Sequence, residues 1–156
     1  MDKLINLTIG QFLEDLAEKY TKRLAVKFPE TDYERTFSEL NNDVDKLAKG
    51  LLGMGLRNGD HAAIWSVNRP EWITLFFATA KIGVVLVPVN AYFKSYEFQY
   101  VLKQSDCRAL FISNGYKGND YMQAINDLCP ELKSCAPGSL FLDEFPLLRT
   151  DRKSVV

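Results

Sequence analysis

The sequence has little cysteine and histidine, which argues against several kinds of metal and redox site. Its three cysteines, Cys107, Cys129 and Cys135, form no C-x-x-C pair, and the single histidine, His61, lies far from them in the sequence. A zinc site therefore lacks clustered ligands, and the cysteines are too few and too scattered for a disulfide framework. We expect reduced thiols and a cytoplasmic protein.

An excess of one charge and a long apolar run are also missing. The 156 residues include 19 basic and 20 acidic side chains, and the formal net charge is -1. A nucleic-acid-binding domain would carry clustered Lys and Arg, so we expect no nucleic-acid partner.

The amino terminus lacks the apolar core of a signal peptide. The most apolar stretch, Trp72 to Val89, is interrupted by Lys81 and Gly83, which predicts a buried helix and strand rather than a transmembrane segment.

The first third of the chain carries local signals for a helix, a β-hairpin and a second helix. Thr8 with Gln11, and Thr36 with Glu39, form capping boxes at which helices begin. Two short apolar runs separated by a turn predict the hairpin between these helices, at Leu24–Phe28 and Tyr33–Phe37. Apolar residues at helical spacing predict one buried face of the first helix: Ile9, Phe12, Leu13, Leu16, Ala17 and Tyr20.

From His61 onward, strand and helix signals alternate. The predicted strands are His61–Val67, Val84–Val89 and Arg108–Ser113, and the predicted helices are Pro70–Ile82, Ser95–Gln104 and Tyr116–Cys129. This order indicates an α/β fold: the helix–hairpin–helix segment leads into the start of a doubly wound parallel sheet with right-handed crossover helices. Val84–Val89, apolar on both faces, is typical of a central strand. The last predicted strand has no evident partner on one side, so we expect residues 1–150 to be the incomplete amino-terminal portion of a larger domain.

Several residues that could carry chemistry are better explained by structure. The glycines Gly50, Gly53 and Gly55 close a helix, whereas a phosphate-binding glycine loop follows a strand and opens a helix. His61 has no orienting partner in the sequence and begins a strand. Cys107 precedes a buried strand without a nearby histidine. The remaining candidates are an acidic pair typical of a solvated loop and aromatic residues typical of a core: Asp143–Glu144, and Trp65, Trp72, Phe76 and Phe77.

Two segments just beyond the carboxyl ends of predicted strands are stronger candidates for a ligand cleft. They are Asn68–Trp72 and Pro88–Asn90. Ligands of open α/β sheets bind at this edge, where short polar side chains can line a cleft. Asn68 can equally cap the next helix and Asn90 can shape a turn, so both interpretations stay open.

The same segments resemble the start of the adenylate-forming superfamily of AMP-dependent synthetases and ligases, most closely its fatty-acyl-CoA synthetase branch. The resemblance covers about Ile5 to Leu132, and His61-Ala62 departs from the usual basic residue followed by valine. It is carried, in order, by Thr36–Leu40, Leu47–Leu52, Gly59–Trp65, Asn68–Trp72, Gly83–Asn90, Glu97–Leu102 and Gln104–Asp106.

The resemblance implies a ligase of fatty acid metabolism that uses ATP, Mg²⁺, coenzyme A and a small-molecule carboxylic acid. The family's phosphate loop, adenylate-binding motifs and catalytic lysine lie downstream of this chain, so no catalytic, cofactor-binding or metal residue is assigned here. We expect the isolated chain to be inactive and to self-associate through its unpaired sheet edge and the helix Pro70–Ile82. The alternatives are the adenylation domain of a peptide synthetase and a freestanding nucleotide- or partner-binding α/β module.

The last six residues, Asp151-Arg152-Lys153-Ser154-Val155-Val156, do not fit the pattern that precedes them. An apolar strand is expected after Thr150, but the chain turns charged. The DNA sequence GATCGGAAGAGCGTCGTG, part of a common short-read sequencing adapter, encodes these residues and is followed there by the stop codon TAG. We therefore expect residues 151–156 to be an adapter-derived tail.

Overall fold

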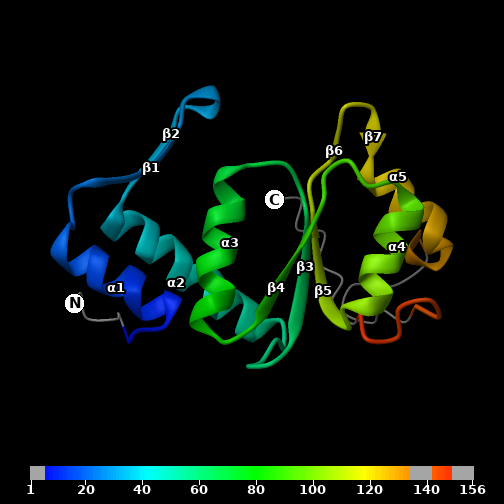
Figure 1. The fold of residues 1–156 in the computed structure, drawn as a ribbon, viewed down its shortest axis with the longest axis horizontal. Coiled ribbons are helices and arrows are strands. Elements are labelled where there is room, and N and C mark those ends of the chain that lie inside the picture. Colours follow the sequence, from blue (N-terminus) through cyan, green and yellow to red (C-terminus); the bar gives the residue numbers. More distant parts are fainter. Residues whose placement is uncertain (1–5, 134–141, 149–156) are drawn as a thin grey trace. The chain divides into compact units, whose positions relative to one another are not determined.

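The computed structural model describes residues 6–133 and 142–148, and the chain divides into two compact units (Figure 1). The first unit comprises Met1–Arg57 and Arg69–Gly83, and the second comprises Asn58–Asn68 and Val84–Val156. Segments of the two units therefore alternate along the chain. Among the described residues, no helix has both the length and the apolar character that crossing a membrane requires.

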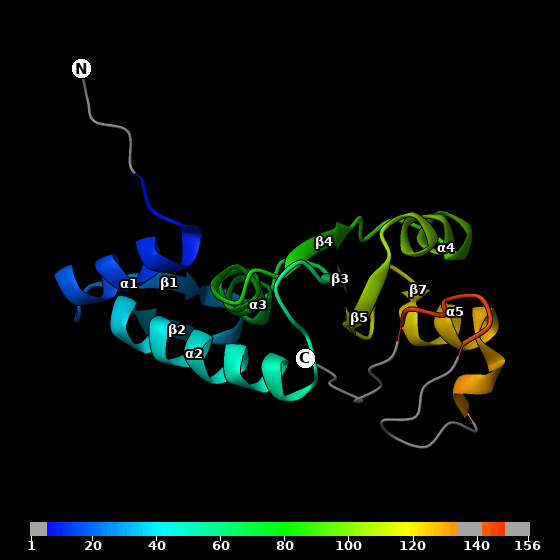
Figure 2. The same cartoon turned by 90° about the horizontal axis from the view of Figure 1, so that it is seen from below.

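Three helices form most of the first unit: α1 (Ile9–Lys19), α2 (Phe37–Gly53) and α3 (Pro70–Lys81), which pack against one another (Figure 2). Both predicted capping boxes are confirmed. The Gln11 backbone N–H donates to Thr8 Oγ1 at 3.2 Å, and the Thr8 N–H donates to Gln11 Oε1 at 2.9 Å. Thr36 and Glu39 repeat the pattern at α2. Each box satisfies backbone N–H groups that an α-helix leaves without partners at its start.

The predicted hairpin is also confirmed. It consists of β1 (Leu24–Phe28) and β2 (Tyr33–Thr36), paired antiparallel and joined by a short 3-10 turn, η1 (Pro29–Thr31). Asp32 closes the turn in the left-handed region, with φ 51°. β2 ends one residue earlier than predicted because Thr36 caps α2 and Phe37 is its first helical residue.

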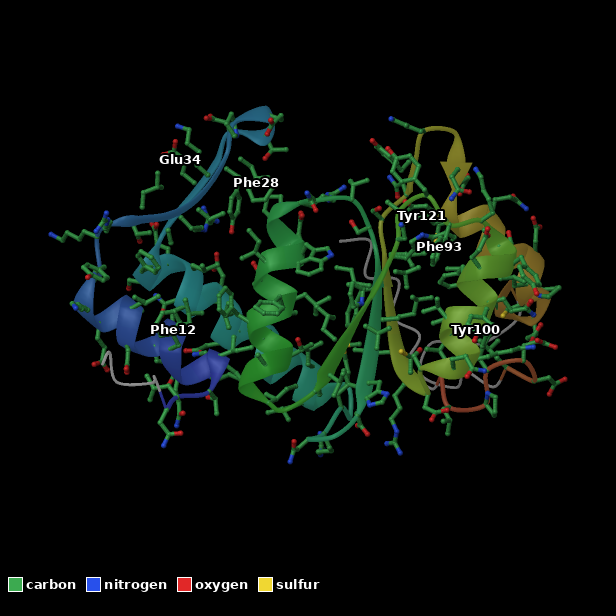
Figure 3. The ribbon with its side chains drawn as sticks, viewed as in Figure 1. Phe12, Phe28, Glu34, Phe93, Tyr100 and Tyr121 are labelled. Carbon is green, nitrogen blue, oxygen red and sulfur yellow. The ribbon has the colours of Figure 1, made fainter. Side chains whose placement is uncertain are left out.

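The buried face of α1 is narrower than predicted. Gly10, Leu13 and Ala17 are buried, at a spacing that places them along one line of the helix. Ile9 and Phe12, predicted to lie on the buried face, are 49% and 41% exposed (Phe12 is labelled in Figure 3). The prediction was wrong for these two residues because they lie beside the line of buried residues and not on it.

Lys81, at the end of α3, ties the three helices together. Its side chain is only 8% exposed, and Nζ donates to Glu14 Oε1 of α1 at 2.8 Å and to Asn41 Oδ1 and Asp45 Oδ1 of α2 at 2.8 and 2.6 Å. Burial opposes the charge, but hydrogen bonds to Asp45 and Glu14 outweigh it and raise the pKa of Lys81. The ammonium group is thus charged and well satisfied where the helices meet.

The second unit contains a parallel sheet of three strands: β3 (His61–Trp65), β4 (Val85–Val89) and β5 (Cys107–Ile112), in the order β4-β3-β5. Trp65 pairs with Val89 on one side and Ile112 on the other, so the strands end together. Between β4 and β5 runs α4 (Ser95–Gln104), and α5 (Tyr121–Leu128) follows β5. The predicted α/β class with parallel strands is confirmed.

Among the described residues β4 is an outer strand of this sheet, so the prediction that it is central was wrong for this part of the chain. Val85 is 48% exposed and Pro88 is exposed, whereas residues 62–65 of β3 are buried. Proline has no N–H to donate and is accommodated at a sheet edge far better than in its centre. The continuous apolar run therefore does not distinguish an outer from a central parallel strand here.

The helix predicted to begin at Tyr116 begins at Tyr121 instead. A small hairpin precedes it, formed by β6 (Gly115–Tyr116) and β7 (Asn119–Asp120). Lys117 and Gly118, at its tip, both have positive φ, 46° and 75°, as a two-residue type I′ turn requires. Asp120 then caps α5 by accepting a hydrogen bond from the Gln123 N–H at 2.9 Å.

Smaller differences concern element ends. β3 stops at Trp65 rather than Val67, and α3 stops at Lys81 rather than Ile82. β5 spans Cys107–Ile112 rather than Arg108–Ser113, and η2 (Pro130–Lys133) follows α5. The cap of α4 is Lys94 rather than Ser95, and the Lys94 N–H donates to Glu97 Oε2 at 3.0 Å.

The core of the second unit joins the sheet to α4 and α5 and to the irregular segment 142–148. Leu142, Phe145 and Leu148 are buried in it although that segment forms no helix or strand. The other buried members are Ala63, Trp65, Val89, Phe98, Leu102, Cys107, Tyr121, Ala124, Ile125 and Cys129.

Substitution of Gly10 tests the close approach of α1 to α3. A Cβ atom at Gly10 would lie 2.8 Å from Lys81 Cγ and 3.1 Å from Lys81 Cα, so we expect Gly10→Ala to destabilise the protein by about 1–3 kcal/mol. Gly50, in the interior of α2, has nothing within 4 Å of its Cβ position, and Gly50→Ala should stabilise by about 0.5–1 kcal/mol. Urea unfolding measures the change in the free energy of unfolding for each variant. A change of the same sign in both variants would contradict the close approach of α1 to α3.

Candidate functional site

The candidate site lies at the carboxyl edge of the parallel sheet in the second unit. Asn68 follows β3, Asn90 follows β4 and Ser113 follows β5. Since the three strands are parallel and end in register, these residues leave the sheet at the same edge. Ligands of open α/β sheets bind there. Residues Arg69–Trp72, which the sequence placed with Asn68, belong to the first unit.

The loop between β4 and α4, residues 90–94, is held by three side chains from other elements. Trp65 Nε1 donates to the Asn90 carbonyl at 3.1 Å, and Tyr121 Oη donates to the Ala91 carbonyl at 2.8 Å. Asn119 Nδ2 donates to the Phe93 carbonyl at 2.7 Å. Figure 3 labels Tyr121 and Phe93 in this region. Three backbone carbonyls of the loop are therefore fixed by donors from β3, α5 and β7.

Asn90 has the turn-shaping role that the sequence left open. Its Oδ1 accepts a hydrogen bond from the Tyr92 N–H at 2.9 Å, and its carbonyl accepts from the Phe93 N–H at 3.0 Å. This is the local side-chain turn that asparagine favours. Asn68 is exposed, and Arg69 rather than Asn68 is the residue that precedes α3 as its cap.

Trp65 supports the loop from within the core. Its ring is stacked between Phe98 of α4, with centroids 4.1 Å apart, and Tyr121 of α5, with centroids 4.0 Å apart. All three side chains are almost completely buried. Trp65 is thus a core residue, as the sequence favoured, but its indole N–H also positions the edge of the sheet. No local pattern signals this contact, since 25 residues separate Trp65 from Asn90.

Ser113 is a polar residue that the sequence did not single out. Its N–H donates to the Trp65 carbonyl at 3.1 Å, which extends the β3–β5 pairing by one residue. Its hydroxyl is buried and, among the described residues, is the buried side-chain polar group without a hydrogen-bond partner. A buried hydroxyl without a partner is energetically unfavourable, so this oxygen is able to bond to a group that reaches this edge.

An exposed cluster of two tyrosines and a lysine adjoins the loop, and sequence reasoning also missed it. The rings of Tyr92 and Tyr116 meet edge to face with centroids 5.3 Å apart, and Lys117 Nζ lies 3.3 Å from Tyr92 Oη. Hydrogen bonds, first with Tyr92 and then with Lys117, lower the pKa of Tyr116, and the same tyrosines raise the pKa of Lys117. Lys117 is placed here by the turn between β6 and β7.

The structural explanations preferred for the other candidates hold. His61 Nδ1 donates to the Ser105 carbonyl at 2.5 Å, which ties the start of β3 to the end of α4. Cys107 is buried, and burial raises the pKa of its thiol, so it is a poor nucleophile. Burial likewise raises the pKa of Cys129 to about 11. Gly53 is the last residue of α2 and Gly55 follows it with φ 92°, so both close the helix as predicted, whereas Gly50 lies inside it.

Glu144 of the acidic pair and the aromatic residues of α3 also have structural partners. Glu144 accepts hydrogen bonds from Lys103 and Gln99, which lower its pKa, on an exposed surface. Trp72, Phe76 and Phe77 contact one another in the first unit and are half-buried. Within residues 6–133 and 142–148, no group of three or more His, Cys, Asp and Glu side chains is arranged to hold a metal ion.

Comparison with known proteins relates the chain to one family. The profile of the family described as AMP-binding enzyme matches residues 13–152. Over 150 residues the chain is 44% identical to the protein named "Putative acyl-CoA synthetase YngI" of Bacillus subtilis (strain 168); the alignment covers 96% of this chain and 27% of that protein.

Two further relatives agree with this match. Over 143 residues the chain is 37% identical to the medium-chain acyl-CoA ligase ACSF2, mitochondrial, of Homo sapiens, covering 92% of this chain and 23% of that protein. The inhibitor-bound crystal structure of the N-terminal domain of FACL13 from Mycobacterium tuberculosis superposes with a TM-score of 0.67 and 28% identity, covering 68% of this chain and 27% of that one. The chain thus spans about a quarter of the length of these curated relatives.

Removal of the Tyr121 hydroxyl tests how the loop is held. Tyr121→Phe leaves the Ala91 carbonyl without its donor, and we expect a loss of about 1–2 kcal/mol and faster hydrogen exchange of the amides of residues 91–94. Tyr96→Phe is the matched control, because Tyr96 is 80% exposed. Urea unfolding and hydrogen-exchange mass spectrometry give the two readouts. Unchanged exchange in Tyr121→Phe would show that the bond does not order the loop.

Proposed function

Because the chain belongs to the AMP-binding enzyme family, we propose that it is the amino-terminal part of an AMP-forming acyl-CoA synthetase. The observation that carries this proposal is the alignment over nearly the whole chain, at 44% identity, with a relative named as an acyl-CoA synthetase. The fold supports it too, since 68% of the chain superposes on the N-terminal domain of FACL13.

The reaction proposed for the whole protein has two steps. The carboxylate of the acid attacks the α-phosphorus of ATP, which forms an acyl-adenylate and releases pyrophosphate. The thiol of coenzyme A then attacks the acyl carbon, which forms a thioester and releases AMP and a proton. Charge neutralisation on the triphosphate and close positioning of a weak nucleophile are the main demands, and Mg²⁺ would meet part of the first. The resemblance assigns the groups that do this to the sequence beyond Thr150.

The contribution of the present chain is to shape the cleft. The loop of residues 90–94 is fixed by Trp65, Asn119 and Tyr121 before any ligand binds. A preordered loop loses little conformational entropy when a ligand arrives, which favours tight and oriented binding. We propose that this loop forms part of the wall of the substrate cleft in the complete protein.

The proposed substrate class is a fatty acid, and the name of the ACSF2 relative makes medium-chain acids the first to test. A cytoplasmic location remains a proposal based on the sequence, and that relative is named as mitochondrial. Cell fractionation with an antibody against the protein would decide between the two compartments.

The test of function uses the complete gene. The full-length protein should release AMP from ATP with octanoate or palmitate and form the corresponding CoA thioester, detected by mass spectrometry. The 156-residue chain, assayed as the control, should release none. Adenylate formation followed by transfer to a carrier protein rather than to coenzyme A would favour a peptide synthetase. Absence of adenylate with any fatty, aryl or amino acid would contradict the proposal.

We also propose that residues 151–156, which lie outside the described part of the chain, derive from a sequencing adapter. Amplification of the locus from source DNA tests this. Codons for an apolar strand after Thr150, followed by a Ser/Thr/Gly-rich segment, are expected. A native stop codon directly after Val156 would refute the adapter origin.

A further inference from the structure

The sequence contains two asparagine–glycine steps, Asn58-Gly59 and Asn114-Gly115, and both asparagines are exposed. An asparagine followed by glycine is prone to lose ammonia, because glycine has no side chain to shield the backbone nitrogen that attacks the asparagine amide. The reaction also requires the asparagine backbone to rotate until that nitrogen reaches the side chain. The surroundings of the two steps differ in the freedom that they leave for this rotation.

Asn58 and Gly59 form an exposed turn between α2 and β3. Gly59 has φ 87°, and nothing lies within 4 Å of its Cβ position, so the space beside its nitrogen is open. The chain is next held at Asp60, whose carbonyl accepts a hydrogen bond from the Val85 N–H at 2.8 Å. Among the described residues, no hydrogen bond holds the backbone of Asn58 or Gly59. Rotation at Asn58 therefore breaks no hydrogen bond within this part of the chain.

The Asn114-Gly115 step is constrained on both sides. The Asn114 carbonyl accepts the Tyr121 N–H at 3.3 Å, and Gly115 belongs to β6, where it pairs with Asp120. A Cβ atom on Gly115 would lie 2.2 Å from the Asn119 carbonyl oxygen, so the space beside this glycine is filled. Rotation at Asn114 therefore requires the small hairpin to open first.

We propose that Asn58 is a site of spontaneous deamidation in the folded chain and that the fold protects Asn114. The Gly59 nitrogen attacks Cγ of Asn58, the new C–N bond closes a succinimide ring, and the side-chain amide leaves as ammonia with the proton of the Gly59 N–H. Water then opens the ring. Opening at Cγ gives aspartate, and opening at the backbone carbonyl gives isoaspartate. The net reaction consumes one water and releases one ammonia.

The product changes both charge and chain length where the second unit begins. Asn58 is the first residue of that unit, and it lies two residues before Asp60, whose Oδ1 pairs with Arg108 Nε at 3.2 Å. Either product adds a negative charge near this pair. Isoaspartate also adds one atom to the main chain just before β3, so we expect it to loosen the hydrogen bond from the Val85 N–H to the Asp60 carbonyl.

Incubation of the folded 156-residue chain at neutral pH, followed by peptide mapping with mass spectrometry, compares the two steps. Asn58 should deamidate at least about fivefold faster than Asn114, because hydrogen bonding must first open at Asn114. In urea the two steps should react at similar rates, since unfolding removes the constraint. Equal rates in the folded chain would overturn the proposal. A difference of the same size in urea would also overturn it, because the neighbouring residues and not the fold would then be the cause.

Matched glutamine variants identify the source of isoaspartate. Glutamine keeps the amide but is one methylene longer, so it closes the corresponding ring far more slowly. Asn58→Gln should remove most of the isoaspartate that an isoaspartate-specific methyltransferase detects in the aged chain, whereas Asn114→Gln should remove little. Both positions are exposed, and circular dichroism verifies that each variant folds. Undiminished isoaspartate in folded Asn58→Gln would refute the assignment.

Discussion

The second unit depends on one buried indole ring. Trp65 ends the central strand, stacks between an aromatic residue of α4 and one of α5, and donates its N–H to the loop that follows β4. One side chain thereby connects the sheet, both helices and the edge where ligands of such sheets bind. A smaller residue in place of Trp65 would have two effects at once. It would leave a cavity between α4 and α5, and it would remove the hydrogen bond that holds the loop after β4.

The first unit is held by different chemistry. Its centre is Lys81, an almost buried charge that reaches carboxylates on two other helices, and Gly10 lets the backbone of α1 approach the base of that side chain. Hydrogen bonds of this kind depend on direction, whereas stacked rings tolerate small displacements. The packing of α1, α2 and α3 against one another is therefore specified by a few hydrogen-bonding atoms. The packing of the aromatic core of the second unit is specified by the shapes of its rings.

Local signals predicted most of the fold, and the errors share a cause. The capping boxes, Pro70 and the strand runs act within a few residues, so Thr8, Thr36 and Pro70 mark helix starts correctly. The exposed flank of α1, the outer position of β4 and the hairpin at residues 115–120 depend on which distant segments pack nearby. The candidate site shows the same limit. The sequence could place Asn90 and Asn68 at one edge of the sheet, but it could not identify Trp65, Asn119 and Tyr121 as the donors that hold the loop. The family was recognised from the order of its segments and not from chemistry at any position.

During synthesis the last segment of the first unit, which ends at Gly83, leaves the ribosome before most of the second unit, although the segments of the two units alternate along the chain. β3 leaves the ribosome before β4 and β5, the strands between which it lies. At about 5–20 residues per second, roughly 1–5 s pass before β4 is complete and roughly 2–10 s before β5 is complete, so the side of β3 that pairs with β5 stays unpaired longest. In that interval residues 69–83 can pack against α1 and α2. The three-helix unit can therefore assemble while β3 still lacks β5, which shortens the length of chain that remains to be ordered when the sheet is completed.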